Sequence, residues 1–124
     1  MTIANEFEGA FRLHQQGKLR EAFLRYDAVL AADPKHAAAL HYSGVAHYQS
    51  DNLQQAFERL RASVNFDGTK PDAWSNLGLV LQAIGHKRAA VEMFERAAQL
   101  DPSSDEVALN LAAAQLAHGD VASG

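Results

Sequence analysis

The amino-acid sequence predicts an all-α protein, a solenoid of three helix–turn–helix repeats followed by a C-terminal capping helix. Three observations lead to this fold class. The chain resembles itself when it is shifted by 34 residues, apolar residues recur at helical spacing, and runs of β-branched residues typical of strands are missing. The chain has 124 residues, of which 48% are hydrophobic and 21% are charged. This length and composition suit one soluble domain, so we expect residues 1–124 to form a single repeat domain.

The repeat is visible as aligned columns of residues. A shift of 34 residues needs no insertion, and Pro34 and Pro102 lie two such shifts apart. The columns that share residue types are Gly17, Asp51, Gly85 and Gly119; Ala22, Ala56 and Ala90; Tyr26, Leu60 and Phe94; Asp33, Asp67 and Asp101; and Gly44 and Gly78. Repeats of this length are typical of stacked helix pairs. The repeats are predicted at about 3–36, 37–70 and 71–104.

Each repeat divides at its Gly or Asp into two amphipathic segments, and the short turn between them makes the paired helices antiparallel. First helices are predicted at about 3–15, 37–49 and 71–83, and second helices at about 18–31, 52–65 and 86–99. Asp-Pro or Asp-Gly ends each repeat, since proline cannot continue a helix. Ser103, with Glu106 three residues later, resembles a capping box that begins a cap helix over 105–118. A tail is predicted at 119–124.

Small residues stand where paired helices are expected to touch. Gly44 and Gly78 lie inside first helices, and Ala22, Ala56 and Ala90 lie inside second helices. A glycine inside a helix costs about 1 kcal/mol relative to alanine, so packing must offset this cost. We therefore predict that these positions are close contacts between helices.

The third repeat carries the most informative pattern, which consists of Trp74, Leu77, Gly78, Leu81, Ala90, Phe94, Ala97 and Pro102. This pattern resembles the tetratricopeptide repeat family. The positions where the first two repeats depart from it are Glu6, Gly9, Ser43, His47, Ser63 and Gly68. His47 is expected to fill a position that the family gives to a bulky packing residue. The resemblance covers essentially the whole chain and implies a right-handed α-solenoid, but its residues are packing residues and do not define a function.

The resemblance also implies that first helices line a concave groove and that second helices form the convex back. The predicted partner-binding residues are Phe7, Phe11, His14, His41, Val45, Tyr48, Ser75, Asn76, Leu79, Gln82, Leu109 and Asn110. This set is apolar and aromatic with almost no charge, and exposed patches of this kind mark interaction sites. The alternative interpretation is that these side chains pack partly on neighbouring helices.

Two binding modes of the family require different residues in these columns. Some members grip a C-terminal carboxylate with Lys, Arg and Asn, but no Lys or Arg occupies the columns here, so this clamp is not expected. Members that are O-linked sugar transferases hold the peptide main chain with a ladder of asparagines, and Asn76 and Asn110 stand in that column. Packing is the alternative role for both asparagines.

Composition excludes several classes of function. The chain has no cysteine, which excludes disulfides, zinc–thiolate sites and thiol catalysis. A net charge of −4 with scattered Lys and Arg predicts no nucleic-acid or membrane partner. The six histidines lack the spacing of a helical metal site, and no phosphate-binding loop or nucleophile–base pair is present. We therefore expect no enzyme activity, no metal and no cofactor. The N-terminus lacks a signal peptide, and a cytoplasmic location is expected.

Charged residues are concentrated on the predicted second helices. Glutamates interleave there with Arg25, Arg59 and other cations, which predicts a solvated convex face. The apolar residues of the cap helix, by contrast, surround most of its circumference: Val107, Leu109, Leu111 and Leu116.

The leading functional prediction is a non-catalytic scaffold or protein–protein interaction module that binds a protein or peptide ligand in the apolar groove. A second hypothesis is the N-terminal substrate-docking domain of a longer enzyme, such as an O-linked glycosyltransferase. A third is a self-associating scaffold that forms a homo-oligomer through its C-terminal helix. The sequence does not identify the partner.

Overall fold

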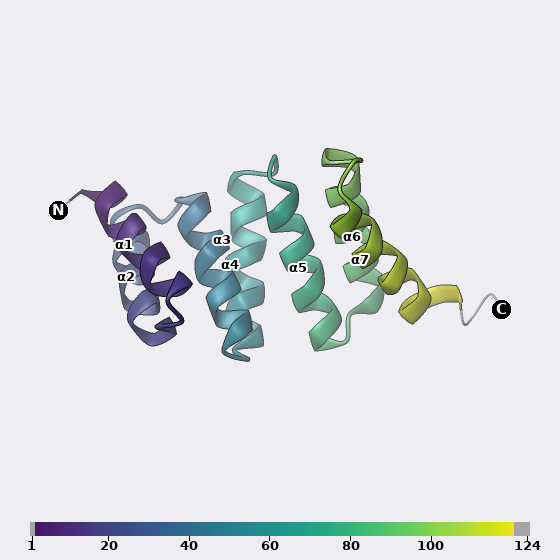
Figure 1. Ribbon diagram of the computed structural model, residues 1–124, viewed down its shortest axis with the longest axis horizontal. Helices are drawn as coiled ribbons and strands as arrows, with labels where there is room; N and C mark the ends of the chain where they lie inside the picture. The colour runs from purple at the N-terminus through teal and green to yellow at the C-terminus, as the bar shows by residue number, and fades with distance from the viewer. Residues whose placement is uncertain (1, 121–124) are drawn as a thin grey trace. The chain divides into compact units, whose positions relative to one another are not determined.

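The computed structural model describes residues 2–120. The chain divides into two compact units, Met1–Phe66 and Asp67–Gly124, called here the N-terminal and the C-terminal unit. Within the described residues, seven α-helices and a short π-helix form, as Figure 1 shows. The predicted all-α fold class, with three helix pairs and a C-terminal helix, is confirmed.

The N-terminal unit consists of two helix pairs. Its helices are α1 Ile3–Gln15, α2 Leu19–Ala32, α3 Ala37–Gln49 and α4 Leu53–Phe66. Helix α1 packs on α2 and α3 packs on α4, while α2 also contacts α3 and so joins the two pairs. Helix α1 begins after Thr2, whose hydroxyl accepts a hydrogen bond from the Asn5 N–H at 3.1 Å.

The C-terminal unit contains one helix pair and the C-terminal helix. Its elements are α5 Pro71–Ile84, α6 Lys87–Leu100, α7 Asp105–Gln115 and the π-helix η1 Leu116–Asp120. Helix α5 packs on α6, and α7 packs on this pair, mainly against α6. The cap helix is predicted over 105–118, but its α-helical part ends at Gln115. The π-helix that follows extends into the predicted tail as far as Asp120. Residues 121–124 of that tail lie outside the described residues.

The prediction that Ser103 caps the seventh helix is wrong. Ser104 is the N-cap, and its hydroxyl accepts a hydrogen bond from the Val107 N–H at 3.2 Å. The Ser103 hydroxyl instead donates to the Asp101 carboxylate at 2.9 Å. The cap must be the last residue with non-helical backbone angles, and that residue is Ser104.

The aligned turn columns correspond to repeated backbone geometry. Gly17, Asp51 and Gly85 all adopt positive φ between paired helices, with values of 79°, 62° and 105°. Between repeats, the Asp33 and Asp67 carboxylates accept hydrogen bonds from the backbone N–H two residues later. The hydrogen bond from the Thr69 hydroxyl is the main reason that the pKa of Asp67 is lowered. Each column therefore reflects a turn requirement.

The aligned positions that hold glycine or alanine are close contacts between paired helices, as predicted. Ala22, Ala56 and Ala90 are fully buried. A Cβ atom added at Gly44 would lie 2.7 Å from the Leu60 Cγ, and one added at Gly78 would lie 2.8 Å from the ring of Phe94. Because the opposing side chains are themselves fully buried, each glycine lets a large residue of the partner helix approach the helix backbone.

Candidate functional site

Four ring side chains of the first helices α1 and α3 lie against one another and form the aromatic face: Phe7, Phe11, His41 and Tyr42. The Phe7 and Phe11 rings stack with centroids 6.3 Å apart, and the Phe11 ring meets Tyr42 edge-on at 4.9 Å. The His41 ring stacks on Tyr42 at 4.6 Å. The structure thus brings three predicted site residues together. It adds Tyr42, which the predicted set leaves out although it shares a column with Asn76.

The rings of the aromatic face differ in how much they can offer to a partner. Phe7, Phe11 and Tyr42 are half-buried, whereas His41 is only 8% exposed. The Phe7 ring also lies 6.1 Å from the Tyr26 ring and 5.1 Å from His36, so its inner side belongs to the core. Phe7, Phe11 and Tyr42 therefore pack on neighbouring rings and are also partly exposed, whereas His41 is buried.

His14 is held by hydrogen bonds inside the N-terminal unit. Its Nε2 lies 2.8 Å from the Gln49 Oε1, and its Nδ1 lies 3.1 Å from the Tyr26 hydroxyl. Because Gln49 Oε1 only accepts, Nε2–H donates to it, and in the neutral ring Nδ1 accepts from Tyr26. Burial raises the pKa of Tyr26 far above its ordinary value, which keeps this hydroxyl a donor. His14 therefore connects α1 to α2 and α3.

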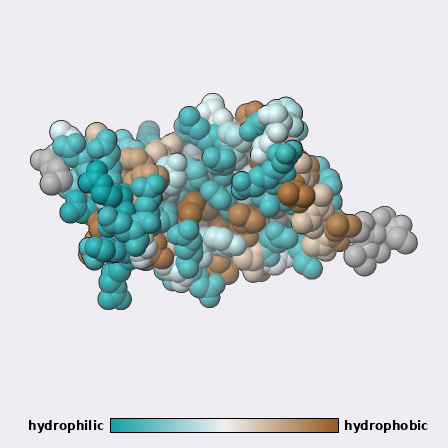
Figure 2. Space-filling view, in the orientation of Figure 1, coloured by the Kyte–Doolittle hydropathy of each residue, from teal (hydrophilic) through white to brown (hydrophobic). Residues whose placement is uncertain are grey.

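The other predicted site residues span a wide range of exposure. Val45 and Tyr48 in the N-terminal unit, and the C-terminal-unit residues Asn76, Leu79, Gln82 and Asn110, are half-buried. Ser75 is buried, and its hydroxyl has no hydrogen-bond partner among the described residues. Leu109 is 70% exposed. Figure 2 shows mainly hydrophilic residues over α1 and hydrophobic residues over α7.

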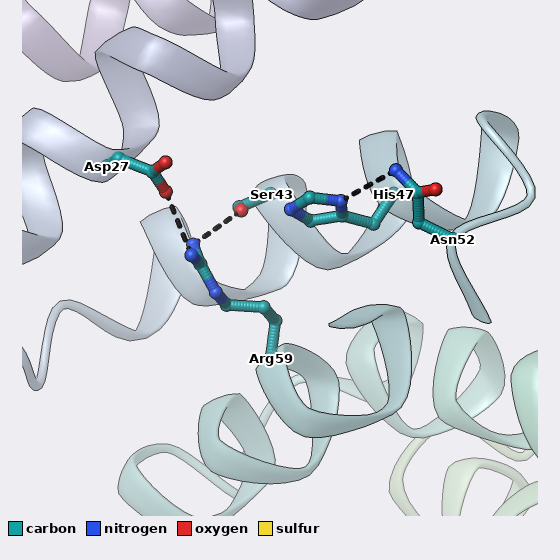
Figure 3. A network of polar contacts seen from close by, with 5 residues as sticks. All are labelled: Asp27, Ser43, His47, Asn52 and Arg59. Carbon is teal, nitrogen blue, oxygen red and sulfur yellow. Dashed lines mark hydrogen bonds and ion pairs between the residues drawn. The ribbon is translucent and has the colours of Figure 1, made fainter. Parts of the chain in front are cut away.

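A polar network missed by the sequence reasoning joins α2, α3 and α4 (Figure 3). The Arg59 guanidinium donates from Nη1 to the Ser43 hydroxyl and from Nη2 to the Asp27 carboxylate, both at 2.8 Å. The prediction that Arg59 is simply part of a solvated face is therefore wrong. The signal was Ser43, which replaces a packing leucine and leaves room and an acceptor for the guanidinium. Because Asp27 is 53% exposed, the ion pair contributes at most about 1 kcal/mol.

Comparison with known proteins identifies the repeat. A family model described as a tetratricopeptide repeat matches residues 13–80, which is more than half of the chain, and a second matches residues 71–114. The chain belongs to the tetratricopeptide repeat (TPR) family. Human Tetratricopeptide repeat protein 7B is 34% identical over 92 residues, which cover 74% of this chain and 11% of that protein. Mouse Protein O-mannosyl-transferase TMTC1 is 32% identical over 97 residues, or 77% of this chain and 10% of that protein. The TPR chain thus spans about a tenth of the length of these relatives.

Solved structures of TPR proteins share the fold at low sequence identity. The first TPR of Spaghetti (RPAP3), bound to an HSP90 peptide, SRMEEVD, has a TM-score of 0.89 at 22% identity, covering 93% of this chain and 91% of that one. MamA has a TM-score of 0.90 at 20% identity, covering 95% of this chain and 69% of that one. These values establish the TPR fold.

His47 occupies a TPR packing position, as expected from the sequence. Its ring stacks on Phe23 of α2 with centroids 4.3 Å apart and planes inclined by 7°. The Asn52 side-chain amide donates to the His47 Nδ1 at 3.3 Å, which places the ring proton on Nε2. Burial first, and then the charge of Arg59, lower the pKa of His47, while Asp27 acts in the opposite direction.

Acidification below about pH 6.5, the pKa of an unfolded histidine, is expected to destabilise the N-terminal unit through His47. Because the folded pKa is lower, the unfolded chain binds the proton first. The stabilisation is present above the unfolded pKa and is lost as the pH falls through the folded one. Urea unfolding followed by far-UV circular dichroism from about pH 8 to 5 measures this slope. His47→Phe should flatten it and the exposed-site control His86→Gln should not; an equal slope in His47→Phe contradicts the assignment.

Among the side chains of residues 2–118, no group of three or more His, Asp, Glu or Cys residues is arranged to hold a metal ion. No helix within the same residues is long and apolar enough to cross a membrane.

Proposed function

We propose that this TPR chain is a non-catalytic module that binds a peptide segment of a partner protein along its first helices. The observation that carries the proposal is the aromatic face. Three of its rings are only half-buried, and they lie beside one another on α1 and α3. Partly exposed aromatic side chains dominate the binding energy of many interfaces because they add large apolar area at a small entropic cost.

The bound segment is proposed to be apolar rather than acidic. The HSP90 peptide in the RPAP3 structure, SRMEEVD, carries three carboxylate side chains, and such charges need cationic partners. The first-helix columns of this chain hold Phe7, Phe11, Val45 and Leu79, and no Lys or Arg. We therefore assign anchoring to an aromatic or aliphatic side chain of the peptide. Asn76 and Asn110, which lie in the C-terminal unit, are proposed to bond the main chain of a peptide bound there.

Two alternative functions rest on separate observations. The match to TMTC1, whose name describes a mannosyl transferase, supports a substrate-docking role within a longer enzyme. Sequencing the native gene past the codon for Gly124 tests that alternative. The exposure of Leu109 at 70% and Leu116 at 62% supports self-association through the end of the C-terminal unit. Light scattering across a concentration series tests it, since a constant monomer mass would contradict it.

A peptide selected from a random display library tests the proposed function. Phe11→Ala is expected to weaken binding of the selected peptide by at least about tenfold while the helical circular-dichroism signal persists, since hot-spot truncations cost about 2 kcal/mol or more. Leu24→Ala is the matched control, because Leu24 is 68% exposed but lies on the second helix α2. Equal affinity for Phe11→Ala and the unaltered chain, or a loss only in Leu24→Ala, would move the site away from the first helices.

A further inference from the structure

We propose a second docking surface on the outer side of the first helix pair, which binds an amphipathic helix of a partner protein. The surface is a shallow depression between α1 and α2, lined by Gly9, Arg12, Leu13, Gln16, Glu21 and Arg25. Its α1 residues lie across the helix from Phe7 and Phe11, so it is separate from the aromatic face. The partner helix carries an aromatic or large aliphatic residue and, four residues later, an aspartate or glutamate.

The depression contains two arginines without partners. Among the side chains described for residues 2–118, neither Arg12 nor Arg25 forms a hydrogen bond or an ion pair. Arg25 extends across Gly9, where an added Cβ atom would lie 2.8 Å from its Nη1. Glu21 lines the same depression, so the three side chains carry a net charge of about +1, because a guanidinium stays protonated in proteins. The depression is thus complementary to a carboxylate.

The second repeat shows how such an arginine is satisfied. Arg59 occupies the position of Arg25 one repeat later, and Ser43 occupies the position of Gly9. Arg59 bonds Ser43 within its own repeat and Asp27 on the second helix of the preceding repeat. Arg25 has no equivalent carboxylate among the described residues. The geometry around Arg59 therefore specifies the missing group, which is an acidic side chain on a helix packed beside α1.

A second contact of the same helix supports this assignment. Besides placing Asp27 on Arg59, helix α2 stacks Phe23 on His47 of α3. The position of His47 in the first repeat is Leu13, which lines the depression together with Arg25. Phe23 and Asp27 are four residues apart and lie on one side of α2. These two contacts of α2 with the second repeat thus have counterpart positions on the first repeat that line one depression.

A second copy of this chain does not supply the partner helix. Helix α6 carries Val91 and Glu95 at the positions of Phe23 and Asp27, which is the required pattern. Helix α7, however, packs against α6 as α3 packs against α2. The α1 helix of a second copy would need the place that α7 occupies. With a second copy excluded in this way, the occupant that we assign is an amphipathic helix of a partner protein.

The test uses the α2 sequence itself as the probe, since α2 makes both of these contacts with the second repeat. A fluorescent peptide of residues 19–32 is held helical by a bridge between positions 20 and 24, which are both exposed in the protein. Fluorescence anisotropy with the full chain should show binding that weakens as salt is added. Arg25→Met in the protein should weaken peptide binding by at least about tenfold. Methionine is tolerated at this position because Met93 occupies it in the third repeat. Arg20→Met is the matched control and should change nothing.

Changes in the peptide identify the binding mode. Asp27→Asn in the peptide should reproduce the loss seen with Arg25→Met, and Glu21→Gln in the protein should tighten binding. Tyr26→Ala in the peptide should have no effect on docking. Tyr26 is buried in the core of the intact protein, so its loss would weaken binding only if the peptide displaced α2 from that core. Absence of binding, equal binding by Arg25→Met, or loss of binding on Tyr26→Ala would each overturn the proposal.

Discussion

Replacing Phe94 with alanine is expected to lower the free energy of unfolding of the C-terminal unit by about 3–5 kcal/mol. Phe94 is fully buried, and its ring packs directly over Gly78 of α5. Alanine at this position would lose the apolar contact and leave a cavity that the rigid helix pair closes only in part. A loss of this size is a large fraction of the stability of a small domain.

The single tryptophan of the chain makes the loss of stability in Phe94→Ala measurable in the C-terminal unit. Trp74 lies on α5, where its indole N–H donates to the Gly68 carbonyl at 3.0 Å. Its fluorescence during urea unfolding therefore reports on the C-terminal unit. Phe66→Ala is the matched control, because Phe66 is 45% exposed, and its loss should stay within about 1 kcal/mol by circular dichroism. A Phe94→Ala loss no larger than that of the control would contradict the packing described here.

Gly44→Val is expected to destabilise the N-terminal unit by about 2 kcal/mol, although valine favours a helix more than glycine does. The new side chain would begin 2.7 Å from the Leu60 Cγ and 3.3 Å from the Ala56 carbonyl oxygen. Leu60 is fully buried and Ala56 presents backbone, so neither can move aside without strain. Overpacking of this kind costs about 1–3 kcal/mol.

The sign of the Gly44→Val effect separates packing from helix propensity. Urea unfolding followed by far-UV circular dichroism measures it. Ala112→Val is the control, since Ala112 stands in the same repeat column but is exposed on α7. A small change in the control with a clear loss in Gly44→Val is the expected pair of results. Stabilisation by Gly44→Val would mean that helix propensity outweighs the contact with Leu60.

The fold was predictable because the repeat places residues with strict steric requirements at fixed positions. Gly17 and Gly85 adopt positive φ, and Asp51 takes the same role in the second repeat. Gly44 and Gly78 are required by the large side chains opposite them. Such positions tolerate few residue types, so they appear as columns, and the predicted helix bounds lie within a residue or two of those observed for the first six helices.

Specific polar contacts were harder to predict, because they depend on which atoms meet after packing. In the sequence, Arg59 resembles the other cations of the second helices. Only the structure shows that its guanidinium donates to the Ser43 hydroxyl. Adjacent serines precede α7, and only backbone geometry decides that Ser104 is the cap. Pairing between helices and local backbone angles are not encoded in residue type alone.

The sequence predicts which side chains of the N-terminal unit lie together, but not how exposed each of them is. The column argument placed Phe7, Phe11 and His41 on one face, and the structure brings them together. The same column, however, contains His41 at 8% exposure and Leu109 at 70%. The difference arises from the neighbours of each position, because Tyr42 covers His41 in the N-terminal unit.

Mapping the bound peptide on the protein tests the central claim most directly. The selected peptide is titrated into ¹⁵N-labelled chain, and the shifts of the backbone amide signals are recorded. The first-helix site predicts that the largest shifts in the N-terminal unit occur on α1 and α3, around Phe11, Tyr42 and Val45. Shifts concentrated instead on the second helices α2 and α4, around Leu24 and Phe66, would contradict it.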